Sequence, residues 1–230
     1  MTELNTAQTL DLWAECRIGD PSGNGAEAWN FEISDRSISA VSFDGYKFDE
    51  DMDFSGYRFP AASFSGATFT GEASFDKTKF TGDAIFIAAI FKQNTFFNYT
   101  TFIGDANFSG AAFADAANFI HTTFADATYF DYTTFAGFAR FNSAKFASTV
   151  NFSHTTFRAD TKFADVEFTE SAHFIEIDAS QTTQLSFSGC TFNKTFNISA
   201  NQRLGCVLDV TGADIKYPFS LERVSCHLRR

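Results

Sequence analysis

The sequence predicts an all-β solenoid, on three observations. A phenylalanine recurs at alternating steps of five and six residues from residue 64 to residue 174, so the repeat has a period of eleven. The residue two positions before each of these phenylalanines is always Ala, Thr or Val. The residues between them are rich in Gly, Ser and Thr, which are poor helix formers. A fixed period in such a sequence is typical of a solenoid. The ladder positions are Phe64, Phe69, Phe75, Phe80, Phe86, Phe91, Phe97, Phe102, Phe108, Phe113, Phe119, Phe124, Phe130, Phe135, Phe141, Phe146, Phe152, Phe157, Phe163, Phe168 and Phe174.

Two other structures with this period are excluded. An eleven-residue repeat also suits a right-handed coiled coil, but the Gly, Ser and Thr content argues against long helices. Straight strands fail because a five-residue step places successive side chains on opposite faces. The chain must therefore turn at each repeat, so that every ladder phenylalanine points to one axis. We interpret these phenylalanines as core and not as a cofactor site.

The motif A-x-F-x-G, found at residues 67–71 and 106–110, resembles the pentapeptide-repeat family. The resemblance extends from about residue 31 to residue 226, although this chain uses Phe where the family more often has Leu and adds a residue to every second lap. It implies a right-handed quadrilateral β-helix, in which four laps make one coil. Two five-residue and two six-residue laps then predict a coil of 22 residues.

Before the repeat, residues 1–30 are expected to form an N-terminal cap made of a helix and a loop. Residues 6–18 read as a short amphipathic helix, with Leu10, Trp13 and Cys16 or Arg17 on one face. A loop at residues 19–25 should follow it. A cap is needed because the end strands of a solenoid expose unpaired backbone groups. A docking helix is the alternative interpretation of this segment.

Residues 31–230 are expected to form the β-helix, which should be most regular over residues 64–174. Its first ladder positions are Ile33, Ile38 and Phe43, and the alternation slips at Phe59 to Phe64, where a step of five follows another step of five. Loops are expected near residues 176–186, with an outward bulge at 179–184, and near residues 199–207. No cap motif is recognisable at the C-terminal end. We therefore expect either a second subunit on that edge, as in a homodimer formed through a solenoid end, or a longer native chain. The later ladder positions are Phe187, Phe192, Ile198, Val210, Ile215, Leu221 and Cys226.

Composition narrows the classes of partner and compartment. The formal net charge of −11 argues against direct binding of nucleic acid or an anionic membrane. The four cysteines show neither a disulfide framework nor a CxxC motif, which suits a reducing compartment. The sequence contains no apolar run long enough to span a membrane and no recognisable signal peptide. We expect a cytoplasmic protein.

Four carboxylates about 22 residues apart, or a multiple of it, are candidates for an acidic face: Asp83, Asp105, Asp126 and Glu170. Residues 49–53 bring four more carboxylates together, but without the spacing of an EF-hand, so we interpret them as a solvated corner and expect no metal. His121, Ser143 and Asp165 fall in one column. They do not form a hydrolytic triad, because serine lies between histidine and the acid.

One coil has apolar residues at positions that should face solvent, and it is the candidate partner surface. Contiguous exposed apolar side chains often mark a contact site, and mutual packing or cover from a loop is the alternative. The residues are Ile85, Ile87, Ile90, Phe96 and Ile103.

The sequence favours a non-catalytic scaffold that binds a protein partner through its flat faces. It has no phosphate loop, no zinc-ligand spacing and no nucleophile with a positioned base, so we expect neither enzyme nor cofactor. The family resemblance implies a sharper alternative, an acidic mimic of duplex DNA that binds gyrase, a type II topoisomerase, and protects it. A passive spacer or targeting domain of a longer protein is a third hypothesis.

Overall fold

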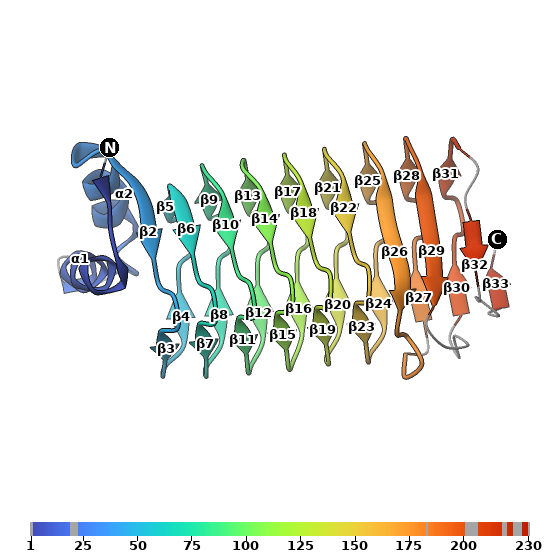
Figure 1. The fold of residues 1–230 in the computed structure, drawn as a ribbon, viewed down its shortest axis with the longest axis horizontal. Coiled ribbons are helices and arrows are strands. Elements are labelled where there is room, and N and C mark those ends of the chain that lie inside the picture. Colours follow the sequence, from blue (N-terminus) through green and yellow to red (C-terminus); the bar gives the residue numbers. More distant parts are fainter. Residues whose placement is uncertain are drawn as a thin grey trace.

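The computed structural model describes residues 2–18, 23–182, 184–200, 207–217, 220–222 and 227–229, the last two segments as backbone only. The chain coils along one axis, with two helices and the N-terminus at one end and the C-terminus at the other (Figure 1). The coils contribute short strands to four parallel sheets, which we name A to D, although in the described part of the chain sheet B has no strand after β23 (Thr156–Phe157). This arrangement confirms the quadrilateral solenoid.

The sheets follow one another in the order A, B, C, D within each coil. Sheet A contains β1 (Thr2–Glu3), β2 (Ile38–Ser42), β6 (Ala61–Ser63), β10 (Ala84–Ile85), β14 (Ala106–Asn107), β18 (Thr128–Tyr129), β22 (Val150–Asn151), β26 (Ala172–Ile177), β29 (Phe196–Ala200) and β32 (Ser220–Glu222). Sheet B contains β3 (Lys47–Phe48), β7 (Thr68–Phe69), β11 (Ile90–Phe91), β15 (Ala112–Phe113), β19 (Thr134–Phe135) and β23 (Thr156–Phe157). Sheet C contains β4 (Met52–Asp53), β8 (Ala73–Ser74), β12 (Thr95–Phe96), β16 (Ala117–Asn118), β20 (Ala139–Arg140), β24 (Thr161–Lys162), β27 (Gln184–Ser186), β30 (Val207–Asp209) and β33 (His227–Arg229). Sheet D contains β5 (Arg58–Phe59), β9 (Lys79–Phe80), β13 (Thr101–Phe102), β17 (Thr123–Phe124), β21 (Lys145–Phe146), β25 (Glu167–Phe168), β28 (Thr191–Phe192) and β31 (Asp214–Ile215).

Strand register confirms the 22-residue coil. Phe91 pairs with Phe69 on one side and with Phe113 on the other, 22 residues away in each direction. The slip in the ladder near Phe59 shortens one coil by a residue, so that Phe59 pairs with Phe80. The alternating steps of five and six residues therefore correspond to the successive sides of each four-sided coil.

The ladder phenylalanines fill the interior, and all of them are at most 1% exposed. Each ring stacks on the ring one coil away: Phe130 lies 4.9 Å from Phe108 and 4.8 Å from Phe152, with interplanar angles of 6° and 5°. Rings on opposite walls of one coil meet edge to face, as Phe108 and Phe119 do at 5.6 Å and 87°. Both arrangements suit the quadrupole of an aromatic ring. The prediction that these residues form the core is confirmed.

Small residues occupy the rest of the interior because the rings leave little space. Where the small residue is threonine at a tight corner, its hydroxyl donates to a ladder carbonyl of the preceding coil. Thr100 Oγ1 lies 2.6 Å from the carbonyl oxygen of Phe75, and Thr122 Oγ1 lies 2.7 Å from that of Phe97. A buried hydroxyl needs such a partner, so threonine can stand where alanine and valine also occur.

The N-terminal cap consists of two helices and not one. α1 (Thr6–Ile18) has the predicted bounds, whereas α2 (Ala26–Asp35) occupies a segment that the sequence divides between a loop and the first laps. The expected domain boundary at residue 30 therefore falls inside a helix, and Ile33 is a helical residue and not a ladder position. Neither of the helices described here is long and apolar enough to cross a membrane.

The cap covers the first coil in three ways. β1 pairs with β2 and extends sheet A. Trp13 of α1 packs its ring over the first coil, 5.7 Å from the ring of Phe54. Trp29 of α2 is fully buried and donates from Nε1 to the Arg58 carbonyl, while Asn30 Oδ1 accepts from the Arg58 amide at 2.6 Å. The edge of β5 thus finds partners that a bare solenoid end lacks.

Towards the C-terminus the coils lengthen. Thr161 pairs with Leu185, 24 residues later, because the lap after sheet B gains two residues. Ala179 is buried and occupies, in the next coil, the ladder position that Phe157 holds on the sheet B wall. The bulge expected at 179–184 therefore begins after Ala179. Pairing of Ile198 with Leu221 and of Phe192 with Ile215 confirms those ladder positions. Cys226 and residues 201–206, where a second loop is expected, lie outside the described residues.

Candidate interaction surface

Two of the four corners in each coil are tight turns, and their second residue adopts a left-handed backbone. These are the turn from sheet A to sheet B and the turn from sheet C to sheet D. Gly66 and Gly110 hold this position at the A–B corner with φ of 64° and 67°. A side chain there costs about 1–2 kcal/mol relative to a right-handed conformation. Nine corners nevertheless carry one: Lys77, Ala88, Tyr99, His121, Tyr132, Ser143, His154, Asp165 and Glu176.

Stacked aromatic pairs occur in both corner columns, on diagonally opposite edges of the solenoid, and each pair spans two successive coils. At the C–D corner the Tyr99 and His121 rings lie 4.9 Å apart, and at the A–B corner the Tyr132 and His154 rings lie 4.7 Å apart. Tyr99 is 57% exposed and Tyr132 is 63% exposed. Glycine would fit these left-handed positions at less conformational cost than an aromatic side chain does.

The A–B column ends in an acid. His154 Nδ1 lies 3.5 Å from Glu176 Oε2, so the column reads Tyr132, His154, Glu176 over three successive coils. The C–D column reads Tyr99, His121, Ser143, Asp165, as the sequence predicts. Its histidine stacks on Tyr99 and lies two coils from the aspartate, with the serine on the coil between them, which leaves no catalytic triad.

The five residues of the predicted partner surface are all at least partly exposed, but they do not share a face. Ile87 is 41% exposed, and Ile90 and Ile103 are 42% exposed. Ile85, Ile87 and Ile90 lie around one A–B corner, whereas Phe96 belongs to sheet C and Ile103 follows the sheet D strand β13. A single contiguous surface of five residues is therefore wrong, because one coil passes over all four walls. Only the first three are neighbours.

Three of the four predicted acidic residues lie together at the corner between sheets D and A. The Asp105 amide donates to Asp83 Oδ1 at 3.1 Å, and the Ala127 amide donates to Asp126 Oδ1 at 2.9 Å. Burial raises the pKa of Asp105, and the Asp126 and Asp83 carboxylates raise it further, while the Ala127 N–H acts in the opposite direction. Glu170 is exposed two coils beyond Asp126, and Thr149 stands on the coil between them, so the row is interrupted.

The comparisons with known proteins agree with this geometry. Residues 75–123 and 119–167 match a family described as pentapeptide repeats (9 copies). Residues 75–167 belong to the pentapeptide-repeat family. No curated protein and no solved structure gives a significant match to it.

Metal ligands do not gather anywhere in the described part of this pentapeptide-repeat protein, where no three His, Cys, Asp or Glu side chains could hold an ion. The acidic segment at 49–53 disperses its carboxylates: Asp49 pairs with Lys47, Asp51 accepts from the Glu72 amide and Asp53 accepts from the Ser55 amide. These partners support the interpretation of a solvated corner.

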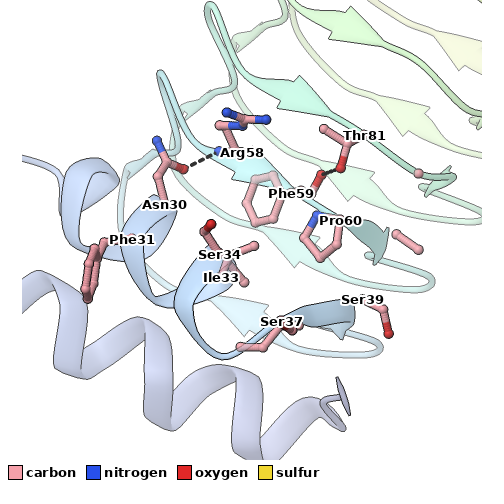
Figure 2. A pocket seen from close by; sticks show the side chains of 13 residues that line it. Asn30, Phe31, Ile33, Ser34, Ser37, Ser39, Arg58, Phe59, Pro60 and Thr81 are labelled. Atoms are coloured by element: carbon pink, nitrogen blue, oxygen red, sulfur yellow. Dashed lines mark hydrogen bonds between the residues drawn. The ribbon is translucent and has the colours of Figure 1, made fainter. Parts of the chain in front are cut away.

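A cleft of about 800 Å³ lies between α2 and the first coil (Figure 2). Ile33, Ser34 and Pro60 face it, and Asn30 is hydrogen-bonded to the Arg58 backbone at its rim. A second cleft, of about 400 Å³, lies between α1 and β2, with Arg36 at its lining. None of the residues lining the larger cleft is an Asp, Glu, His or Cys, so it offers no general acid or base.

Neither cysteine with a described side chain is suited to nucleophilic chemistry. Burial raises the pKa of Cys16 to about 11, with a further contribution from Glu32, and burial raises the pKa of Cys190 to about 12. Both thiols are less than 5% exposed. A thiol that stays protonated at neutral pH is not a ready nucleophile.

The stacked corner pairs were not predicted as a surface from the sequence. The signal that could have found them is a motif, an aromatic residue followed by Thr-Thr-Phe. It occurs at 99–102, 121–124, 132–135 and 154–157. Because it repeats at 22-residue spacing within each pair, it places the two rings of each pair on successive coils.

Proposed function

We propose that this pentapeptide-repeat solenoid is a non-catalytic protein-interaction module that binds its partner at the corner between sheets A and B. The contact surface, which we name the A–B corner surface, comprises Ile85, Ile87, Ile90, Tyr132 and His154. The observation that carries the proposal is the exposure of these apolar and aromatic side chains along one edge, two of them on left-handed backbone.

The types of residue exposed favour binding at this corner over binding at the flat faces. The outward positions of sheets A and C are mostly Ser, Asn, Asp, Lys and Arg, whose desolvation opposes binding. At the A–B corner the three isoleucines and the tyrosine offer apolar area that is already held in place by the rigid coil. Aromatic anchors and preorganisation are what the centre of a protein interface uses.

The test replaces the two most exposed of these isoleucines, Ile87→Ser with Ile90→Ser. We expect the double variant to fold normally and to lose partner binding at least tenfold, because two apolar side chains leave the interface at about 1 kcal/mol or more each. The measurement is affinity capture from the source cell, read by quantitative mass spectrometry against the unmodified protein.

The same coil provides the control. Phe96→Ser with Ile103→Ser removes two apolar side chains from sheets C and D and should leave capture unchanged. Equal capture by the wild type and both double variants would place the contact elsewhere and overturn the proposal.

A second candidate, mimicry of duplex DNA towards gyrase, is favoured by the row of Asp83, Asp105 and Asp126. One row supplies a carboxylate about every 4.8 Å, the coil spacing, whereas a duplex carries a charge about every 1.7 Å. The row also stops before Glu170. We therefore rank mimicry below binding at the A–B corner, and a passive spacer role below both.

Mimicry is tested with purified gyrase and a quadruple variant, D83N/D105N/D126N/E170Q. We expect the wild type neither to inhibit supercoiling nor to protect gyrase from a quinolone, and the variant to melt at a slightly higher temperature because like charges repel across coils. Inhibition by the wild type that the variant loses would instead establish mimicry.

A further inference from the structure

Tyr132 has one ring face covered and one uncovered. Its ring stacks on His154 of the next coil at 4.7 Å and 12°, so the rings pile up along the solenoid axis. The other face of Tyr132 is directed at the preceding coil, where the corner residue is Gly110, whose amide donates to the Asp131 carbonyl. Apart from Gly110 and its two sequence neighbours, no described residue has an atom within 4 Å of the position that a Gly110 Cβ would take. The space above Gly110 is therefore an open slot against the tyrosine ring.

The slot has a carboxylate beside it and an apolar far side. Asp131, the residue before Tyr132, is partly exposed, and its Oδ1 accepts from the Ser109 hydroxyl at 2.9 Å. Beyond Gly110 the next corner residue is Ala88, preceded by Ile87 and followed, after Ala89, by Ile90. From Ala88 to Tyr132 is two coil spacings, about 9.6 Å, which leaves room for one planar group to lie on the ring.

We propose that this slot binds the guanidinium group of an arginine side chain from the partner protein. The proposal rests on the interaction function assigned to the A–B corner surface and names the chemistry that this surface recognises. A planar cation suits the negative face of a tyrosine ring, and its N–H groups can reach the Asp131 carboxylate. Lysine lacks the flat group that fills the slot. The net charge of −11 favours a basic partner by long-range attraction.

The opposite corner supplies an internal comparison. Tyr99 stacks on His121 at 4.9 Å, much as Tyr132 stacks on His154. The corner residue that precedes Tyr99 is Lys77 and not glycine, and its amide donates to the Asn98 carbonyl of the next coil. The C–D corner therefore carries a cationic residue at the position where the A–B corner has glycine. The C–D corner should therefore accept no arginine.

The experiment uses the full chain labelled with 3-fluorotyrosine and read by fluorine NMR, with each resonance assigned by Tyr→Phe variants. The probes are a peptide of alternating arginine and glycine and its lysine twin. We expect the arginine peptide to shift the Tyr132 resonance at least threefold more than the lysine peptide does, and to move the Tyr99 resonance by less than half as much. Gly110→Asn, which fills the slot with a residue that tolerates left-handed backbone, should abolish the Tyr132 shift, and Asp131→Asn should reduce it.

Equal shifts with the two peptides, equal shifts of Tyr132 and Tyr99, or a Tyr132 shift that survives in Gly110→Asn would each overturn the inference. These outcomes are separable from failure of the proposed function. If the Ile87→Ser, Ile90→Ser variant loses its partner while the arginine peptide leaves Tyr132 unchanged, the corner binds protein without an arginine in the slot. If the peptide result is positive and capture is unaffected, the slot exists but is not the partner site.

Discussion

Phe130→Ala is expected to lower the free energy of unfolding by about 3–5 kcal/mol, because the cavity it leaves lies in a close-packed column of rings. The alanine removes a ring that stacks between Phe108 and Phe152 and that meets Phe141 edge to face at 5.5 Å. The rigid coils on either side cannot collapse into the space without breaking strand pairing. Denaturant titration followed by circular dichroism measures the loss.

An exposed phenylalanine provides the control for this experiment. Phe138 is 50% exposed, and the Arg140 guanidinium lies 5.3 Å from the centre of its ring. Phe138→Ala should cost less than about 1 kcal/mol. If the two substitutions cost the same, the ladder is not the source of stability. Should Phe130→Ala fail to fold, Phe130→Leu, which keeps most of the volume, should still be measurable at about 1–1.5 kcal/mol.

Trp29→Ala is expected to detach the N-terminal cap. The tryptophan is fully buried, its ring lies 5.5 Å from that of Phe59, and its Nε1 donates to the Arg58 carbonyl. Loss of a buried tryptophan costs about 3–5 kcal/mol. Because coils contact only their neighbours, the damage should stay near the end of the solenoid. Hydrogen exchange should therefore accelerate in α2 and β5 while β14 to β22 keep their protection.

The uncovered edge should also make the variant associate, since unpaired strand edges template aggregation. Light scattering at increasing concentration measures this. Phe31→Ala on the same helix is the matched control, because Phe31 is 63% exposed and its loss should change neither exchange nor scattering. Equal scattering of the two variants would mean that Trp29 does not hold the cap.

Much of the fold could be predicted because the repeat encodes it redundantly. Phe113 and Phe130 are buried where the ladder places them, and α1 begins and ends at the expected residues. α2 was missed for a physical reason. Ile33 imitates a ladder residue by its five-residue spacing from Ile38, yet the buried residue of that segment is Trp29. Whether the segment forms a helix or a lap is decided by what packs against the end of the first coil.

The candidate surface was less predictable than the core. The spacing correctly implied that Asp83, Asp105 and Asp126 are neighbours, because column position follows from a period of 22. The same period places Ile87 and Ile103 on different walls, because they belong to different laps of one coil, but the spacing could not show how far each side chain is exposed. Nor could it show that Tyr132 has a free ring face, because that depends on the residue one coil earlier being glycine and on the orientation of both.

By itself, the sequence determined the class of fold, the length of the coil and the identity of the core, because an uninterrupted period constrains every coil in the same way. Only the tertiary structure decided which corners bear left-handed backbone and which ring faces remain open. The reason is that the repeat specifies the interior, where every coil must be alike. The surface is specified by pairs of residues 22 positions apart, and their side-chain orientations appear only once the coils are stacked.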